Sequence, residues 1–363
     1  MNKKENILIS PLNWGLGHAA RLIPIIKHLD KEGNNLIIGG SGVAIEILKK
    51  AFPHLEFVYI PSPTLVYGKR KSFSLVFYLS FIKFIANVFH ENFVLRKIIS
   101  EKNISVVISD NRLGLYNKKI KSIYLSHQLN IYLTTNRKKP SPVATFAHRS
   151  YIKKFDYCLV PDIDSVENSL TGRLTENSKN LNLKFIGPIS RFEIRKDFYQ
   201  RKIKYDFVCI LSGPEPQRTM LEKKMIDIFD NSNYKIVIIR GLPKCSEKKK
   251  DSTSIRFLNH ATDSELLDYI NCSKRIICRS GYTTIMDLVN IGRRAILIPT
   301  PGQSEQEYLA LRLSEKHAFV SINQYELNPT SFDVEYDEVW KFENNPNKMK
   351  NILNNIIPVN NCV

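Results

Sequence analysis

Short apolar runs alternate with amphipathic stretches along this chain, and the alternation starts again half-way. The runs lie at 7–11, 35–39, 57–61, 105–110, 122–126 and 157–161, and then at 206–211, 235–240, 254–258, 275–278 and 295–299. Runs that are apolar throughout are typical of parallel strands buried on both faces. Helical patterns at 264–271, 283–291 and 306–316 fall between them. This order predicts a doubly wound α/β sheet in each half.

The length of the chain, 363 residues, fits two domains. We predict an N-terminal domain over 1–194, a C-terminal domain over 195–340, and a helical tail over 341–363 that packs back on the domains. A charged stretch at 187–205 marks the boundary. Two facing domains of this kind leave a cleft between the carboxyl ends of their strands, where ligands bind in such sheets.

The composition limits the classes of partner that we expect the protein to bind. A net charge of +18 suits nucleic acid, an anionic membrane surface or a polyanionic small substrate. The chain has neither zinc-finger spacing nor an RNP aromatic motif, so we expect no nucleic acid partner. Its six cysteines show no C-x-x-C spacing, which indicates neither a disulfide framework nor a zinc site. The apolar run at the N-terminus is too short for a signal peptide, so a cytoplasmic location is predicted.

The first loop whose residues could bind a ligand or take part in catalysis reads N-W-G-L-G-H and starts at Asn13. Gly15 and Gly17 permit a tight turn and close approach of a ligand at a helix N-terminus. A dinucleotide site would need an acidic residue about 20 positions further on, where this chain reads I-I-G-G-S. His18 either orders the loop or acts as a general base, because an imidazole titrates near neutral pH. His127 follows another strand and can contact an acceptor or be structural.

Two loops in the second half follow strand ends and open helices. The first reads C-R-S-G-Y-T-T-I-M-D-L from Cys278, and its hydroxyls and backbone N–H groups can bind a diphosphate or simply cap the helix. Asp287, one turn further on, can accept hydrogen bonds from ribose hydroxyls. The second loop reads P-T-P-G-Q-S-E-Q-E-Y-L-A from Pro299. It offers Glu305 and Gln306 to sugar hydroxyls.

Together these segments resemble the family 28 glycosyltransferases. The C-R-S-G-x-x-T-x-x-(D/E) segment and the (E/Q)-Q-x-Y-x-x-A-like stretch carry the resemblance over 275–310, and the G-x-G-H loop extends it. It implies the GT-B architecture, with two facing Rossmann-like domains and a cleft between them. It also implies an inverting transferase that moves a hexose or N-acetylhexosamine from a nucleotide diphosphate sugar, with UDP as the expected nucleotide. The expected acceptor is a glycan or lipid-linked molecule of the cell envelope, and no cofactor or metal is expected.

The resemblance also assigns roles to residues. His18 would be the catalytic base, Arg191 would reach the donor phosphates, and Asp287 would bind the ribose. Further donor contacts are expected from Ser212, Gly213, Phe257, Ser280, Gly281, Tyr282, Thr283, Thr284, Glu305 and Gln306. Acceptor-side contacts are expected from Asn13, Gly15, Gly17, His127 and Asn130.

Two alternatives remain open from the sequence. The segment G-x-G-H-x-x-R, which ends at Arg21, also resembles nucleotide-sugar hydrolases of the same fold, in which His18 would activate water. A non-catalytic protein that binds nucleotide sugars or polyanions is the alternative of another class.

The segment 69–102 is basic and aromatic. Phe73, Phe77, Phe81 and Phe84 are spaced for one helical face, but the apolar stretch is too short to span a bilayer. It forms either a buried crossover helix or a peripheral contact with anionic lipid on the inner face of the cell membrane.

Overall fold

The computed structural model describes residues 4–62, 75–132, 139–165, 167–176, 178, 180–192, 202–230, 232–316, 318–334, 342 and 345–357. For residues 75–85 the structure describes the helix but not the side chains. The chain divides into two compact units. Unit 1 comprises Met1–Ile131, Pro140–Ile189 and Asn344–Val363, and unit 2 comprises Tyr132–Lys139 and Ser190–Glu343.

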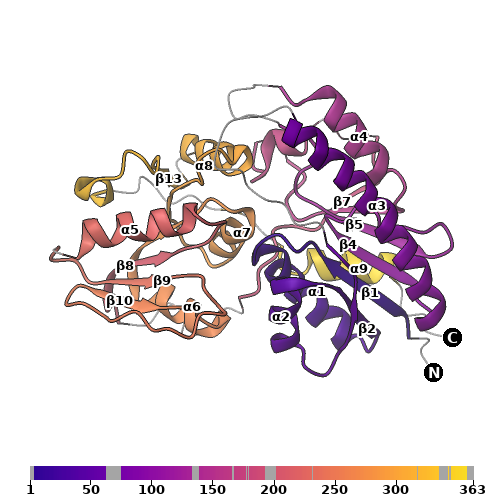
Figure 1. The fold of residues 1–363 in the computed structure, drawn as a ribbon, viewed down its shortest axis with the longest axis horizontal. Helices are drawn as coiled ribbons and strands as arrows, with labels where there is room; N and C mark the ends of the chain where they lie inside the picture. Colours follow the sequence, from indigo (N-terminus) through magenta and orange to yellow (C-terminus); the bar gives the residue numbers. More distant parts are fainter. Residues whose placement is uncertain are drawn as a thin grey trace. The chain divides into compact units, whose positions relative to one another are not determined.

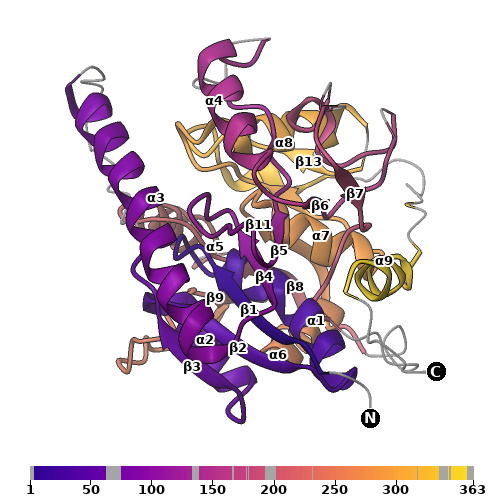
Figure 2. The same cartoon turned by 90° about the vertical axis from the view of Figure 1, so that its right-hand side faces the viewer.

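Unit 1 is built on a seven-stranded sheet with the order β3-β2-β1-β4-β5-β6-β7, and every pairing in it is parallel. Figure 2 shows helix α3 on one side of this sheet and helices α1 and α9 on the other. The strands are β1 (Asn6–Pro11), β2 (Asn35–Gly40), β3 (Glu56–Tyr59), β4 (Val106–Asp110), β5 (Lys121–Leu125), β6 (Tyr157–Val160) and β7 (Leu183–Phe185). The helices are α1 (Gly17–Lys31), α2 (Gly42–Ala51), α3 (Leu75–Lys102), α4 (Pro142–Ile152), a 3₁₀ turn (Gly172–Leu174) and α9 (Lys348–Ile356).

Unit 2 holds a six-stranded parallel sheet with the order β10-β9-β8-β11-β12-β13. Its strands are β8 (Tyr205–Ile210), β9 (Ile236–Ile239), β10 (Ile255–Leu258), β11 (Ser273–Cys278), β12 (Ile296–Leu297) and β13 (Val320–Ser321). Its helices are α5 (Gln217–Phe229), α6 (Asp263–Asn271), α7 (Tyr282–Asn290), α8 (Ser304–Glu315) and a 3₁₀ turn (Pro329–Phe332). Helices α5 and α6 lie on opposite faces of the sheet (Figure 1).

Each apolar run identified in the sequence forms a strand within a residue or two of its predicted limits, which confirms two doubly wound parallel sheets. The predicted helices in the second half correspond to α6, α7 and α8. Two edge strands were not predicted, because β7 reads L-K-F and β13 reads V-S, and neither forms a recognisable apolar run. The units divide after Ile189, within the charged stretch at 187–205.

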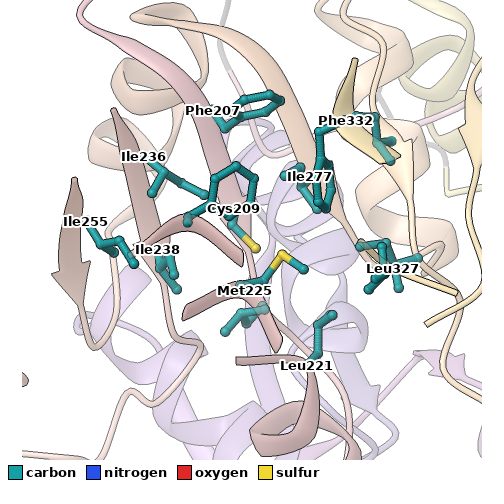
Figure 3. Close-up of a cluster of buried hydrophobic side chains, with 14 residues drawn as sticks. Phe207, Cys209, Leu221, Met225, Ile236, Ile238, Ile255, Ile277, Leu327 and Phe332 are labelled. Carbon is teal, nitrogen blue, oxygen red and sulfur yellow. The ribbon is translucent and has the colours of Figure 1, made fainter. Parts of the chain in front are cut away.

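Helix α5 packs on the sheet of unit 2 through a buried cluster of mainly aliphatic side chains that also includes Phe207, Phe229 and Phe332 (Figure 3). The ring of Phe207, on β8, lies 5.3 Å from that of Phe229 and 5.9 Å from that of Phe332, between ring centroids. All three rings are almost fully buried. Because such aromatic pairs add to the free energy of burial, this cluster fixes α5 and with it the loop after β8.

Unit 1 contains a buried ion pair that joins α3 to the loop after β4. Arg112 donates from Nε to Oε1 of Glu91 at 3.0 Å and from Nη1 to Oγ of Ser10 at 3.0 Å. The backbone N–H of Gly114 donates to the other oxygen of Glu91 at 3.2 Å. The two charged side chains are 0% and 2% exposed. The ion pair therefore holds α3 against the loop that follows Asp110, at the carboxyl end of β4.

The basic, aromatic segment forms a helix from residue 75 onward. Among the described residues, no helix is long and apolar enough to cross a membrane. Phe73 lies outside the described residues, and so do the side chains of Phe77, Phe81 and Phe84. Further along α3, Phe89 and Phe93 are 68% and 70% exposed.

Candidate active site

The carboxyl ends of β1, β4 and β5 bring three sequence segments to one edge of the unit 1 sheet. The register aligns Pro11 with Asp110 and Asp110 with Leu125. Because the strands are parallel, the residues that follow them emerge on the same side. The loop that leads to His18, the end of β4 and the segment around His127 therefore lie together.

At this edge two histidines, an arginine and an aspartate form what we call the histidine cluster: His18, Arg21, Asp110 and His127. Nδ1 of His18 lies 3.0 Å from Oδ2 of Asp110 and 2.7 Å from Nη2 of Arg21. Arg21 donates from Nε to Oδ2 of Asp110 at 3.0 Å, also contacts Oδ1, and reaches Nδ1 of His127 from Nη1 at 3.0 Å. The structure thus brings together the two histidines that the sequence placed at one edge.

Burial governs the charges of the cluster. The side chains of Arg21 and Asp110 are 2% and 0% exposed, and that of His18 is 12% exposed. Burial and the charge of Arg21 lower the pKa of His18, although Asp110 opposes the shift. Burial alone would raise the pKa of Asp110, but Arg21 and His18 outweigh it and hold that pKa below its usual value. At neutral pH the cluster therefore holds an ionised carboxylate beside a neutral imidazole, as a general base requires.

The loop before His18 is held by close packing. A Cβ on Gly42 would lie 2.2 Å from Nδ2 of Asn13, so this contact requires a glycine at the start of α2. The backbone N–H of Asn13 donates to Oγ of Ser62 at 3.2 Å. Gly15 has a φ of +77°, which favours glycine. Gly17 then begins α1, and the indole of Trp14 is left 43% exposed.

In unit 2, Asp287 joins α7 to the first residues after the unit boundary. Its Oδ1 accepts from Oγ of Ser190 at 2.7 Å and from the backbone N–H of Arg191 at 3.3 Å. Its Oδ2 lies 3.2 Å from Nε of Arg191, whose Nη1 is 3.1 Å from Oδ1 of Asp263. Burial raises the pKa of Asp287, and Arg191 opposes the shift. The proposed ribose and phosphate ligands are thus bonded to each other.

The comparisons with known proteins agree with this architecture. The glycosyltransferase family 28 C-terminal domain matches residues 215–356. An uncharacterized glycosyltransferase of Methanosarcina mazei is 23% identical over 337 residues, which cover 85% of this chain and 83% of that protein. The structure of the glycosyltransferase SnogD from Streptomyces nogalater superposes with a TM-score of 0.61 at 13% identity, over 98% of this chain and 96% of that one.

A third relative extends the likeness over nearly the whole chain. The UDP-N-acetylglucosamine--N-acetylmuramyl-(pentapeptide) pyrophosphoryl-undecaprenol N-acetylglucosamine transferase of Prochlorococcus marinus subsp. pastoris is 21% identical over 365 residues, which cover 96% of this chain and 91% of that protein. The chain is a glycosyltransferase. Its residues 215–356 resemble the family 28 C-terminal domain. Its fold is GT-B, as predicted, and the prediction of an enzyme is confirmed over the non-catalytic alternative.

In this glycosyltransferase the two loops predicted to bind the donor are joined by hydrogen bonds. Ser280 is 0% exposed and donates from Oγ to the backbone oxygen of Gln306 at 2.8 Å. Oε1 of Gln306 accepts from the backbone N–H of Thr300 at 2.9 Å. The hydroxyl of Ser280 therefore bonds to the protein, where the sequence suggested a phosphate. Tyr282 is 2% exposed and packs in the core.

The N-terminus of α7 has the features of an anion site. Its N-cap is Gly281, which has no side chain to cap the helix and has φ −70° and ψ 134°. A Cβ there would meet nothing within 4 Å. The half-buried Thr283 and Thr284 lie in the first turn. The chain's own packing therefore does not require a glycine at this point.

The remaining predicted donor residues lie around these loops. Gly213 has a φ of +105°, and a Cβ there would lie 3.5 Å from Oγ1 of Thr300. Ser212 and Glu305 are half-buried. The backbone N–H of Phe257 donates to Oδ1 of Asp251 at 2.8 Å, so this N–H is already satisfied and a base-reading role would need another group.

Asn130 has a structural set of bonds in this transferase. Its Nδ2 donates to the backbone oxygens of Arg173 and Glu176 at 2.7 and 3.0 Å, and its Oδ1 accepts from Arg149. It is also 5% exposed. These bonds favour a role in holding the loop after β5, rather than contact with an acceptor.

One D-x-D spacing occurs in the chain, at Asp162–Asp164. Asp162 is 0% exposed, and its carboxylate accepts from the backbone N–H groups of Ile163, Leu170 and Thr171. It therefore organises a loop. Within the described ranges, no group of three or more His, Cys, Asp or Glu residues could hold a metal ion.

Two residues of the histidine cluster were not identified as functional from the sequence. Asp110 ends a largely apolar strand. A carboxylate at the carboxyl end of a buried strand could have been used to predict a functional residue. Arg21 stands three positions after His18, which places both on one helical face. The spacing G-x-G-H-x-x-R therefore indicates that Arg21 lies near His18, but it does not indicate that both side chains contact Asp110.

Proposed function

We propose that the protein transfers a hexose or N-acetylhexosamine from a nucleotide diphosphate sugar to a hydroxyl of a glycan or lipid-linked acceptor of the cell envelope, with inversion and without a metal ion. The observation that supports the chemistry is a neutral, partly exposed His18 beside an ionised, buried Asp110. UDP as the nucleotide and a lipid-linked acceptor are supported by the name of the Prochlorococcus relative.

In this mechanism His18 acts as the base. Nδ1–H of His18 donates to Asp110, and the lone pair on Nε2 takes the proton of the acceptor hydroxyl. The acceptor oxygen forms a bond to the anomeric carbon as the bond from that carbon to the diphosphate oxygen breaks. The electron pair leaves with the nucleoside diphosphate, and the proton stays on Nε2. Asp110 stabilises the imidazolium that results, and a single displacement inverts the anomeric configuration.

The donor would be held by unit 2. The N-terminus of α7 and the guanidinium of Arg191 would neutralise the diphosphate, which other transferases neutralise with a metal. Asp287 would accept from the ribose, and Glu305 and Gln306 would bind the sugar. Since Arg191 contacts Asp287 and Asp263, a donor has to share or replace those contacts.

Donor binding is tested by thermal stability in the presence of a chelator, with UDP, GDP, TDP, CMP and their sugar conjugates. A diphosphate at 100 times its dissociation constant should add about 2.7 kcal/mol to the free energy of unfolding. We expect one nucleotide diphosphate to stabilise the protein without metal. No response to any nucleotide, or a response only after metal is added, contradicts the proposal.

Gly281→Ala sharpens this test. The backbone angles suit alanine and the space is open, so the ligand-free melting temperature should stay unchanged. The added methyl group would stand where a phosphate approaches the helix, and stabilisation by the nucleotide should fall. Asn347→Ala is the matched control, because Asn347 is the N-cap of α9 in unit 1 and also makes no side-chain cap bond. An unchanged nucleotide response in Gly281→Ala argues against diphosphate binding at α7.

Peripheral contact with anionic lipid through 69–102 is a further part of the proposal. Exposed Phe89 and Phe93 on α3 support it, together with the net charge of +18. Sedimentation with anionic but not neutral vesicles is the expected result, and no sedimentation with either contradicts it.

A further inference from the structure

Arg21 contacts three different side chains of the histidine cluster. Its Nε and Nη2 face the two oxygens of Asp110, Nη2 also lies 2.7 Å from Nδ1 of His18, and Nη1 lies 3.0 Å from Nδ1 of His127. A guanidinium stays charged in proteins and offers only donors. Each atom that bonds to Arg21 must therefore accept a hydrogen bond.

For His127 this requirement fixes the tautomer. If Nδ1 accepts from Nη1 of Arg21, the neutral ring carries its proton on Nε2. His127 is also 5% exposed, so the surrounding residues restrict the position of its ring. The ring can then donate a hydrogen bond from Nε2 but cannot accept a proton there.

For His18 the situation differs, because Nδ1 has two neighbours with opposite demands. With a proton it donates to Oδ2 of Asp110 at 3.0 Å, and without one it accepts from Nη2 of Arg21 at 2.7 Å. The first state leaves a lone pair on Nε2, and the second puts a proton there. Only the first state is a base, and only the carboxylate of Asp110 favours it.

We propose that Arg21 is a positioning residue that sets the tautomers of the two histidines: it holds His127 with its proton on Nε2, and by keeping Asp110 ionised it leaves on Nε2 of His18 the lone pair that acts as the base. This rests on the proposed function and deepens it. Asp110 supplies the preference of His18 for Nδ1–H, and Arg21 holds Asp110 ionised.

The tautomers can be measured directly by ¹⁵N NMR on histidine-labelled protein, at neutral pH and without substrate. Signals are assigned with His18→Gln and His127→Gln. We expect Nε2–H on His127 and Nδ1–H on His18. A proton on Nδ1 of His127, an imidazolium there, or Nε2–H on His18 overturns the assignment. Since no substrate is present, this result does not depend on whether the protein transfers sugar.

Two Arg21 variants extend the test. Arg21→Lys keeps a positive charge but cannot span Asp110 and both rings, so His127 should populate both tautomers. His28, on the same helix and bonded through Nε2 to Asn354 at 2.8 Å, is the internal control and should not change. A His127 tautomer unaffected by Arg21→Lys overturns the proposal.

Arg21→Met removes the charge that lowers the pKa of His18. The groups that face His18 are then Asp110 on β4, which raises that pKa, and His127 after β5, which lowers it, while burial still lowers it. We expect the acid limb of kcat/KM to move to higher pH, because His18 stays protonated, and inactive as a base, to a higher pH. An unmoved acid limb with reduced activity would indicate a merely structural role. If Arg21→Met does not fold, the NMR measurements on the wild type and on Arg21→Lys still test the tautomers that the proposal assigns.

Discussion

Replacing His18 by Gln is expected to lower kcat by about 10²–10⁴-fold, the usual contribution of a general base. Gln retains a polar group of similar reach but cannot take a proton from the acceptor hydroxyl. The donor would be bound by residues of unit 2, so its dissociation constant should stay close to the wild-type value. Steady-state transfer and nucleotide titration measure the two quantities separately.

His28→Gln is the matched control for this variant. His28 also lies on α1 and is buried, but it bonds to Asn354 on α9 and has no place in the proposed mechanism. It should leave kcat unchanged. If His18→Gln weakens donor binding while kcat is kept, His18 belongs to the donor site and the role assigned to it is wrong.

Glu91→Leu is expected to destabilise unit 1 by about 3–5 kcal/mol, the cost of leaving one charge of a buried pair without its partner. Arg112 would keep a buried guanidinium beside Ser10 but would lose the carboxylate that faces its Nε. The N–H of Gly114 would lose its acceptor as well. Urea denaturation followed by circular dichroism measures the change in the free energy of unfolding.

Two controls separate charge from packing in this experiment. The double variant Glu91→Leu/Arg112→Met removes both charges and should recover much of the loss, because two apolar side chains can replace a buried pair. Glu101→Gln breaks the exposed pair between Lys97 and Glu101 on the same helix, whose side chains are 70% and 54% exposed, and should cost less than about 1 kcal/mol. A double variant as unstable as Glu91→Leu would show that the shape of Glu91 matters more than its charge.

The fold could be predicted from the sequence because both sheets are parallel and covered on both faces. Strands such as β4, which reads V-V-I-S-D, are then apolar along almost their whole length. The exceptions are edge strands, where burial no longer imposes that composition. Strand β3, E-F-V-Y, is an intermediate case, with half-buried residues at its centre.

The histidine cluster could be predicted only in part. His18 and His127 follow strand ends, and this placed them at one edge. Their connection through Arg21 and Asp110 depends on β4 lying next to β1, a strand order that sequence patterns do not contain. The pairing of Pro11 with Asp110 is what brings the carboxylate to α1.

On the donor side, motif spacing identified the loops but not the bonds within them. The family pattern points to Ser280, Gln306 and Asp287 as ligands. In the structure Ser280 bonds to the backbone of Gln306, and Asp287 bonds to Ser190 and to Arg191. Such internal partners depend on side-chain geometry, which a spacing pattern cannot supply.

Sugar transfer is tested directly by an assay with UDP-sugar labelled in the sugar, lipid-linked and soluble glycan acceptors, and chelator present. We expect label in an acceptor product of inverted anomeric configuration, with UDP released in equal amount and almost no product from His18→Gln. Label released as free sugar at a rate independent of acceptor would identify a hydrolase that uses His18 to activate water. Label that stays in the nucleotide sugar with every acceptor, or product that forms only when metal is supplied, would show that the protein does not carry out the proposed metal-independent transfer.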